Sequence, residues 1–329
     1  MRSLTSLLTL GLVGHLLPIE AATEKVVTKK MGSRFEITAV HPDAAVARAA
    51  IEAAYAEIDR LEAMISSWRN DSETARINQA AGRHPVAVSP ELFGLVRRSL
   101  KISALTDGVF DISFAGAGQL WDFKAAHPKL PDPKDLARKL ALVDYRRIAL
   151  DAPKRTLFRE KPGMRLGFGA IGKGFAANHA VHVLKERGIS SGVVNAGGDL
   201  VAFGQREDGS PWTVAIADPQ KRDSVFAWLN IREQAVVTSG DYERFVTIDG
   251  KRYSHILDPK TGFPANDLRS VTIICPDGEL ADALATAVFI MGRAAGLDLV
   301  NRLKGVEAIL VTAEGELRYS NHIQTQLDF

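Results

Sequence analysis

Apolar residues recur along the chain with the two periods that distinguish helices from strands. Between residues 43 and 68 they return every three or four positions, which predicts an amphipathic helix with Asp43 as its N-cap. The apolar positions of this helix are Ile51, Tyr55, Ile58, Leu61 and Ile65. Three further stretches read as helices, and each ends at a glycine or an Asp-Gly pair. These are residues 90–105, 169–188 and 277–292.

Strand patterns lie between the helices. The stretch "VVTKKMGSRFEITAV" reads as a strand with a break at Met31-Gly32-Ser33, and "SGVVNAGGDLVAFG" as two strands separated by glycines. Two hairpins are predicted, one turning at Asp249-Gly250 and one at Glu314-Gly315. "FKAAHPKLPDPKD", residues 123–135, has three prolines and is expected to be a loop.

This irregular order of helices and hairpins predicts the α+β class. Largely antiparallel or mixed sheets fit it better than a doubly wound parallel sheet. No G-x-G-x-x-G follows a strand in a βαβ context, so the pattern does not indicate a Rossmann nucleotide site.

Composition narrows the class further. The chain has 329 residues, of which 46% are apolar and 24% charged, as in soluble globular proteins with one large domain or two joined lobes. The formal net charge is +2 and no long run of like charges occurs, which argues against a nucleic-acid surface. The single cysteine, Cys275, follows Ile273 and Ile274 on a predicted strand and is interpreted as a buried apolar residue.

The first 22 residues differ from the rest. One arginine precedes an almost uncharged apolar run that ends in small residues, which is typical of a secretory signal peptide cleaved near Ala22. The alternative is a membrane anchor, but the run is short and Pro18 and Glu20 end it. We expect residues 23–329 to form one domain. The region has no cysteine, which disfavours a lipid anchor and leaves export to the periplasm as the expectation.

Asp282 and Thr286 are the first candidates for chemistry. They are four residues apart on a predicted helix and therefore share a face. A carboxylate and a hydroxyl are hard oxygen ligands that suit Mg²⁺. The alternative is structural, with the aspartate favoured by the helix dipole and the threonine bonded to the backbone.

A second candidate is the glycine-rich start of the helix at 169–188. Four glycines surround Lys173, and backbone N–H groups exposed at a helix start can bind a phosphate. The spacing is not that of a Walker A loop, and tight packing of small residues explains the glycines equally well.

Two polar turns and one helix end are weaker candidates. Asp111 in "TDGVFDIS" and Asp199 in "NAGGDL" are interpreted as turn residues. Trp68 ends the first helix, and its local context favours a core position over a ring that stacks on a ligand.

"YSHILDPKTGFPA" is the last candidate. His255 stands at the end of a hairpin strand, and Pro259, Gly262 and Pro264 follow it closely. A fixed imidazole that titrates near neutral pH suits a general base. A structural or surface histidine is the alternative.

Together these segments resemble the FAD:protein FMN transferase family, the ApbE-type flavin transferases. Eight stretches occur in the family's order over nearly the whole mature chain, including "HILDPKTGFP" and "ADALATAVFIMG". The resemblance implies a two-lobed α+β catalytic domain that uses Mg²⁺ and FAD. FMN would pass from FAD to a Ser or Thr of an acceptor protein, and AMP would leave.

The resemblance also implies roles for individual residues. His255 is the expected catalytic residue, and Asp282, Thr286 and the carbonyl of Ala170 are the expected Mg²⁺ ligands. The expected flavin-nucleotide pocket comprises Met31, Trp68, Val109, Phe110, Asp111, Lys173 and Ile256. Gly167 and Ala285 depart from the pattern of many members, which predicts a missing nucleotide contact and a more hydrated Mg²⁺.

Two other functions remain open at this point. Water could replace the acceptor, which would make the chain an FAD pyrophosphatase that produces FMN and AMP. An exported flavin carrier without catalysis is the other alternative, although it would need no metal at the pyrophosphate. The resemblance implies a membrane-linked redox subunit as the acceptor and no nucleic-acid partner.

Overall fold

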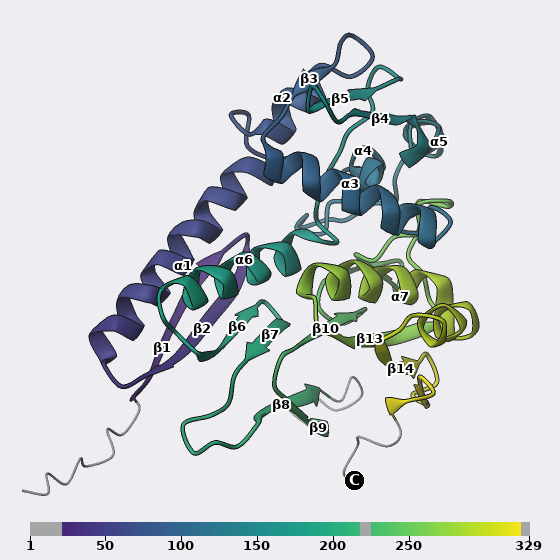
Figure 1. The fold of residues 1–329 in the computed structure, drawn as a ribbon. Coiled ribbons are helices and arrows are strands. Elements are labelled where there is room, and N and C mark those ends of the chain that lie inside the picture. The colour runs from purple at the N-terminus through teal and green to yellow at the C-terminus, as the bar shows by residue number, and fades with distance from the viewer. Residues whose placement is uncertain (1–21, 218–224, 324–329) are drawn as a thin grey trace, which may run out of the picture.

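An antiparallel sheet of eight strands forms the base of the structure (Figure 1), a computed structural model that describes residues 22–217 and 225–323. In spatial order the strands are β1 (Ala22–Lys30), β2 (Ser33–His41), β6 (Ser191–Ala196), β7 (Asp199–Phe203), β10 (Gln234–Gly240), β13 (Leu268–Cys275), β14 (Glu307–Thr312) and β15 (Leu317–Tyr319). Every pair of neighbours is antiparallel. The expected α+β class with antiparallel sheets is confirmed.

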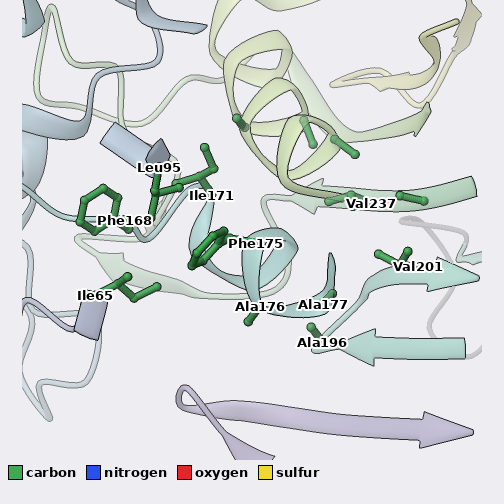
Figure 2. Close-up of a cluster of buried hydrophobic side chains, with 14 of the residues drawn as sticks. Ile65, Leu95, Phe168, Ile171, Phe175, Ala176, Ala177, Ala196, Val201 and Val237 are labelled. Atoms are coloured by element: carbon green, nitrogen blue, oxygen red, sulfur yellow. The ribbon is translucent and has the colours of Figure 1, made fainter. Parts of the chain in front are cut away.

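Three helices cover one face of this sheet. They are α1 (Ala44–Ile65), α6 (Gly172–Glu186) and α7 (Gly278–Asn301), and α6 packs between the other two. Figure 2 shows Phe175 of α6 among apolar side chains from α1 and the strands, all in the main core. Asp43 accepts hydrogen bonds from the first N–H groups of α1, so the predicted helix and its cap are confirmed.

The opposite face of the sheet carries a smaller core. A separate hairpin, β8 (Trp212–Ala217) and β9 (Val225–Ile231), lies against it. Val236 and Ile274 belong to this second core, whereas their neighbours Val237 and Ile273 belong to the first. The sheet is therefore buried on both faces here, because successive residues of a strand point to opposite sides.

The part of the chain that connects α1 to α6 forms a second lobe, at the top of Figure 1. Its elements are α2 (Glu73–Gln79), β3 (Val86–Ala87), α3 (Pro90–Leu105), η1 (Ile112–Phe114), α4 (Ala115–Gly118), α5 (Pro133–Leu140), η2 (Tyr145–Arg147), β4 (Ile148–Asp151) and β5 (Thr156–Arg159). The predicted loop 123–135 is a loop only as far as Asp132, which caps α5. The two-lobed arrangement agrees with the expectation from the sequence.

Two elements depart from the predicted pattern. The break at Met31-Gly32 is a hairpin turn between two strands, with φ of 49° and 74° at these residues. α7 does not stop at Gly292 but breaks there and continues to Asn301. Gly292 has φ 79° and ψ 178°, and Asp267 accepts a hydrogen bond from the N–H of Arg293, as a cap would.

Two sequence interpretations concern burial and the membrane. Cys275 is 1% exposed at the end of β13, as predicted, and burial raises the pKa of its thiol to about 11. In the described part of the chain, α7 alone is long and apolar enough to cross a membrane, and it is packed in the core of the domain. The predicted signal peptide falls almost wholly outside the described residues.

Candidate active site

The first turns of α6 and α7 meet where the glycine-rich motif predicted a helix start. A methyl group at position 174 would collide with the carbonyl oxygen of Gly278 and lie 2.8 Å from Cβ of Asp282. Asn178 joins the two helices, since its Oδ1 accepts from the N–H of Gly278 at 2.9 Å and its Nδ2 donates to Asp277 at 3.0 Å. The glycines therefore allow a close approach that brings Asp282 against the start of α6.

Three charged groups are enclosed at this contact. The carboxylate of Asp282 accepts a hydrogen bond from the N–H of Gly174 at 3.0 Å, and Nζ of Lys173 lies 2.7 Å from Oδ2 of Asp199. Burial would lower the pKa of Lys173, but Asp199 and Asp282 raise it above its usual value, so the lysine stays a cation. Burial raises the pKa of both aspartates. A second cation beside these two buried carboxyl groups would stabilise their charged forms.

A small cavity of about 70 Å³ opens at Thr286, one helical turn after Asp282. It brings together five of the predicted site residues, namely Val109, Phe110, Asp111, Ala170 and Thr286. Its remaining lining includes Gly167 and the loop residues Leu257 and Pro259. Segments from both lobes therefore meet at one place, as a bound nucleotide would require.

The oxygen donors at the cavity suit a hard cation. Ala170 and Thr286 both line it, and Asp282 lies one helical turn before Thr286. A carbonyl, a hydroxyl and a carboxylate are the ligand types that Mg²⁺ prefers. The donor set at this place therefore fits the metal that the sequence predicted.

His255 follows a hairpin of β11 (Phe245–Ile248) and β12 (Lys251–Ser254), as predicted. Its Nδ1 lies 3.1 Å from the carbonyl oxygen of Arg244. A carbonyl can only accept, so Nδ1 carries the proton and Nε2 of the neutral ring has a free lone pair. Burial lowers the pKa of His255 to about 4. The imidazole is therefore neutral at physiological pH and able to accept a proton at Nε2.

The loop after His255 is held by its own backbone. Asp258 accepts from the N–H of Gly262 at 2.7 Å through its carbonyl, and its N–H donates to Phe263 at 2.9 Å. Nε1 of Trp121 donates to the carbonyl of Gly262 at 2.9 Å, and Phe123 contacts the ring of His255 edge-on with centroids 6.5 Å apart. Gly262 has φ 73°, which few other residues adopt. The second lobe thereby fixes the position of this loop.

Several predicted site residues lie outside the cavity lining. Lys173, Asp282, His255 and Ile256 do not line it but are close in sequence to residues that do. Ile256 directly precedes Leu257, Lys173 is two residues after Ile171, and Asp282 is one helical turn before Thr286. Met31 lies at the β1–β2 turn, near the start of α6, because its Cε is 3.6 Å from where a Cβ of Gly172 would stand. Its N–H donates to Glu62 at 2.9 Å.

The core interpretation of Trp68 is wrong. Its side chain is 79% exposed in the loop after α1. The helical period that buries Ile65 ends at the cap residue Ser66, so the position of Trp68 does not follow from that period. A large exposed aromatic ring is free to stack on a planar ligand.

Asp111 has a structural task besides its place in the cavity. Oδ1 accepts from both the N–H and the hydroxyl of Ser113 at 2.7 Å, and Oδ2 accepts from the N–H of Tyr145 at 2.9 Å. Asp111 therefore stabilises a turn, as predicted. The carboxylate holds the cavity wall to the segment around Tyr145.

Sequence reasoning missed two residues of this region. Asp199 was interpreted as a turn residue, yet it is the ion-pair partner of Lys173. The available signal was an aspartate directly after Gly197-Gly198, where a strand starts close to other backbone. Trp121 gave no local signal, because its partner at Gly262 is 141 residues away.

Comparison with known protein families shows to which family this chain belongs. The model of the ApbE family matches residues 31–310. The chain belongs to the ApbE family. An FAD:protein FMN transferase of Treponema pallidum is 35% identical over 292 residues, which cover 84% of this chain and 81% of the relative. One of Salmonella typhimurium is 30% identical over 90% of this chain and 86% of its own length.

Solved ApbE structures have the same fold. The ApbE protein of Thermotoga maritima superimposes with a TM-score of 0.86 at 28% identity, covering 94% of this chain and all of that one. The flavin transferase ApbE of Vibrio cholerae gives 0.84 at 26% identity, covering 93% and 100%. The similarity therefore extends over both lobes.

The structure shows what surrounds Gly167 and Ala285, the two residues expected to depart from the ApbE pattern. A Cβ at position 167 would lie 2.8 Å from Cβ of Ala115, so a larger side chain here would need a shift of α4. Ala285 is fully buried among core residues. Its environment is therefore apolar, consistent with a metal held by the other donors alone.

Proposed function

We propose that this protein is an Mg²⁺-dependent FAD:protein FMN transferase that attaches FMN to a Ser or Thr of an acceptor protein as a phosphoester and releases AMP. The observation that carries the proposal is the ApbE match over residues 31–310, with curated relatives that bear the name of this activity. Membership of this family makes the chain a transferase.

In the proposed reaction the acceptor hydroxyl oxygen forms a bond to the FMN phosphorus. The bond from that phosphorus to the bridging oxygen of FAD breaks, and AMP leaves with the electron pair. The proton of the hydroxyl passes to Nε2 of His255, whose Nδ1 proton is directed to the carbonyl of Arg244. The rigid turn after His255 supports this role, because phosphoryl transfer depends mainly on positioning.

The metal site would be formed by the carbonyl of Ala170, the carboxylate of Asp282 and the hydroxyl of Thr286. Bound Mg²⁺ supplies charge neutralisation at the pyrophosphate and at the leaving AMP. Lys173 contributes a permanent positive charge at the start of α6, where backbone N–H groups also favour a phosphate.

The flavin nucleotide would be held between the two lobes. We assign Val109, Phe110 and Asp111 to the cavity wall, and Met31 and Ile256 to its border. The exposed ring of Trp68 is suited to stack on a planar part of FAD.

The remaining assignments concern location and partner. We propose that residues 1–22 direct export to the periplasm, where a membrane-linked redox subunit would present the acceptor hydroxyl. The net charge of +2 gives no reason to expect a nucleic-acid partner.

The test is to incubate the purified protein with FAD, Mg²⁺ and candidate periplasmic acceptor fragments, and to measure both AMP and acceptor mass. A transferase gives one FMN mass gain on Ser or Thr for each AMP, and chelation of Mg²⁺ abolishes both. AMP release at the same rate without any mass gain would indicate the pyrophosphatase instead. Binding of FAD without AMP release would indicate a carrier.

A further inference from the structure

The hairpin before His255 pairs with no other strand in the part of the chain that the structure describes. β11 and β12 form a two-stranded sheet by themselves. The N–H of His255 donates to the carbonyl of Arg244 at 3.0 Å, and paired residues of an antiparallel ladder alternate between bonded and non-bonded. The backbone groups of Arg252 and Ser254 therefore point away from β11.

A polar pocket of about 310 Å³ runs along this edge. Both outward residues of β12, Arg252 and Ser254, line it. The other lining residues are Ala265, Asn266, Leu268 and Arg269, together with Asp241 and Ala313. The N–H of Ala265 donates to the carbonyl of Ile256 at 3.2 Å, which joins this segment to the chain just after β12.

The groups in the pocket suit an extended polypeptide. The hydroxyl of Ser254 is buried, with the residue 5% exposed, and has no hydrogen-bond partner among the described residues. Such a group costs free energy unless a ligand satisfies it. Free strand edges bind extended peptides through main-chain hydrogen bonds, whereas an apolar small molecule would leave these groups unpaired.

The charge of the pocket favours an acidic segment. Arg252 donates to the carbonyl of Asp241 at 2.7 Å, and Arg269 donates through Nε to Ala313 at 2.9 Å. Asp241 is the one carboxylate in the lining, so two guanidinium groups face a single negative charge. A bound strand that carries a carboxylate would balance the excess positive charge of the pocket.

We propose that this pocket binds the acceptor protein, whose extended segment adds to β12 as a further strand and leads its hydroxyl to His255. The inference rests on the transferase function proposed above and extends it to a docking site. Ser254 directly precedes His255, so a strand paired with β12 ends beside the imidazole. The acceptor would be recognised by its backbone conformation first and by an acidic side chain second.

The experiment uses synthetic peptides of about ten residues with one central Ser or Thr, β-branched flanks, and Asp, Asn or Lys scanned through the flanking positions. The full protein is incubated with each peptide, FAD and Mg²⁺, and the FMN transferred per AMP released is measured. We expect at least tenfold more transfer to an Asp peptide than to its Lys counterpart. N-methylation of alternate backbone nitrogens in the best peptide should reduce transfer at least tenfold in one register and little in the other.

Matched protein variants test which edge is used. Ser254→Pro removes an outward N–H of β12, and Thr247→Pro, at the position paired with Arg252, removes an outward N–H of β11. The transfer ratio should fall at least tenfold in S254P and stay unchanged in T247P. Equal effects of the two variants, or equal transfer to N-methylated and parent peptides, would overturn the docking site.

The failure of the proposed function looks different. If the wild-type protein releases no AMP from FAD, the transferase proposal itself fails. If it releases AMP but labels none of the peptides, the docking proposal fails while the flavin chemistry stands.

Discussion

The two sides of the candidate site are built in opposite ways. On the helix side, comprising the first turns of α6 and α7, buried charges are enclosed by glycine contacts and helix packing. On the hairpin side, comprising residues 244–263, His255 is held by backbone hydrogen bonds and aromatic contacts near the surface. Neighbouring carboxylates thus keep Lys173 charged on the helix side, while burial keeps His255 a neutral base on the hairpin side.

This difference separates the two demands of the proposed reaction. A dinucleotide pyrophosphate needs fixed positive charge in a protected place, which the helix side offers. An acceptor protein needs an accessible edge, which the hairpin side offers. Variants on the two sides should therefore fail in different assays.

The largest effect is expected on the hairpin side. His255→Ala should lower FMN transfer by about 10²- to 10⁴-fold, because the general base is lost, and leave FAD affinity within a few-fold. Transfer rates and FAD titration measure the two quantities. His182→Ala is the control, since His182 is an exposed residue of α6 paired with Glu186. Unaltered transfer in H255A would rule out the role assigned to this residue.

On the helix side, the close approach of α6 to α7 is expected to have the largest effect on the free energy of unfolding. Gly174→Ala places a methyl group against Gly278 and should cost about 3 kcal/mol of unfolding free energy through overpacking. Gly169→Ala is the matched control in the same motif, because no atom lies within 4 Å of its Cβ position. Chemical denaturation measures both variants. Equal stabilities would show that α6 and α7 do not meet as described.

The charge of Asp282 should set the metal requirement. Asp282→Asn keeps the shape but removes the charge, so the Mg²⁺ concentration for half-maximal AMP release should rise on the order of a hundredfold. Thr286→Val, which removes only a neutral ligand, should give a smaller rise. A titration of activity against Mg²⁺ measures this, and the idea is abandoned if D282N needs no more metal than the wild type.

The neutral state of His255 predicts a pH dependence of stability. Burial lowers the pKa of His255 in the folded protein to about 4, whereas the unfolded chain has the ordinary value near 6.5. The unfolded state then binds more protons between these values, so stability is fully present above pH 6.5 and falls as the pH drops toward 4. The loss should be on the order of 2 kcal/mol. Urea unfolding of wild type and His255→Gln at several pH values isolates it, since the variant lacks this slope.

The smallest effect is expected from Trp121, whose hydrogen bond to Gly262 holds the loop on the hairpin side. Trp121→Phe removes the hydrogen bond to the carbonyl of Gly262 and should cost about 1 kcal/mol. Because the loop after His255 would move more freely, transfer should fall a few-fold while the Mg²⁺ requirement stays constant. A shift in the Mg²⁺ requirement instead would mean that the two sides are not independent.

How far the sequence predicts this architecture depends on how local each signal is. The helix capped by Asp43 and the turn at Asp249-Gly250 follow from neighbouring residues, and both were predicted. The pairing of Lys173 with Asp199 depends on α6 packing across β7, which no local pattern contains. The same holds for the cavity, whose walls come from four separate segments.

Trp68 shows the limit of periodicity at an element end. The local context of Trp68 at the helix end favoured a core position, but the chain leaves the helix at Ser66 and the ring turns to solvent. The roles of individual site residues came from the family resemblance, and their chemistry awaits the assays above.

The break at Gly292 divides α7 into two pieces with separate supports. The first piece carries Asp282 and Thr286 and packs in the core, whereas the second begins at a cap supplied by Asp267 from a different segment. Residues 293–301 bury fewer side chains than the first piece, chiefly Leu299 and Val300, so they can open at a lower free energy. Amide hydrogen exchange should reveal two protection levels within this one helix, with slow exchange confined to the half that bears the oxygen ligands.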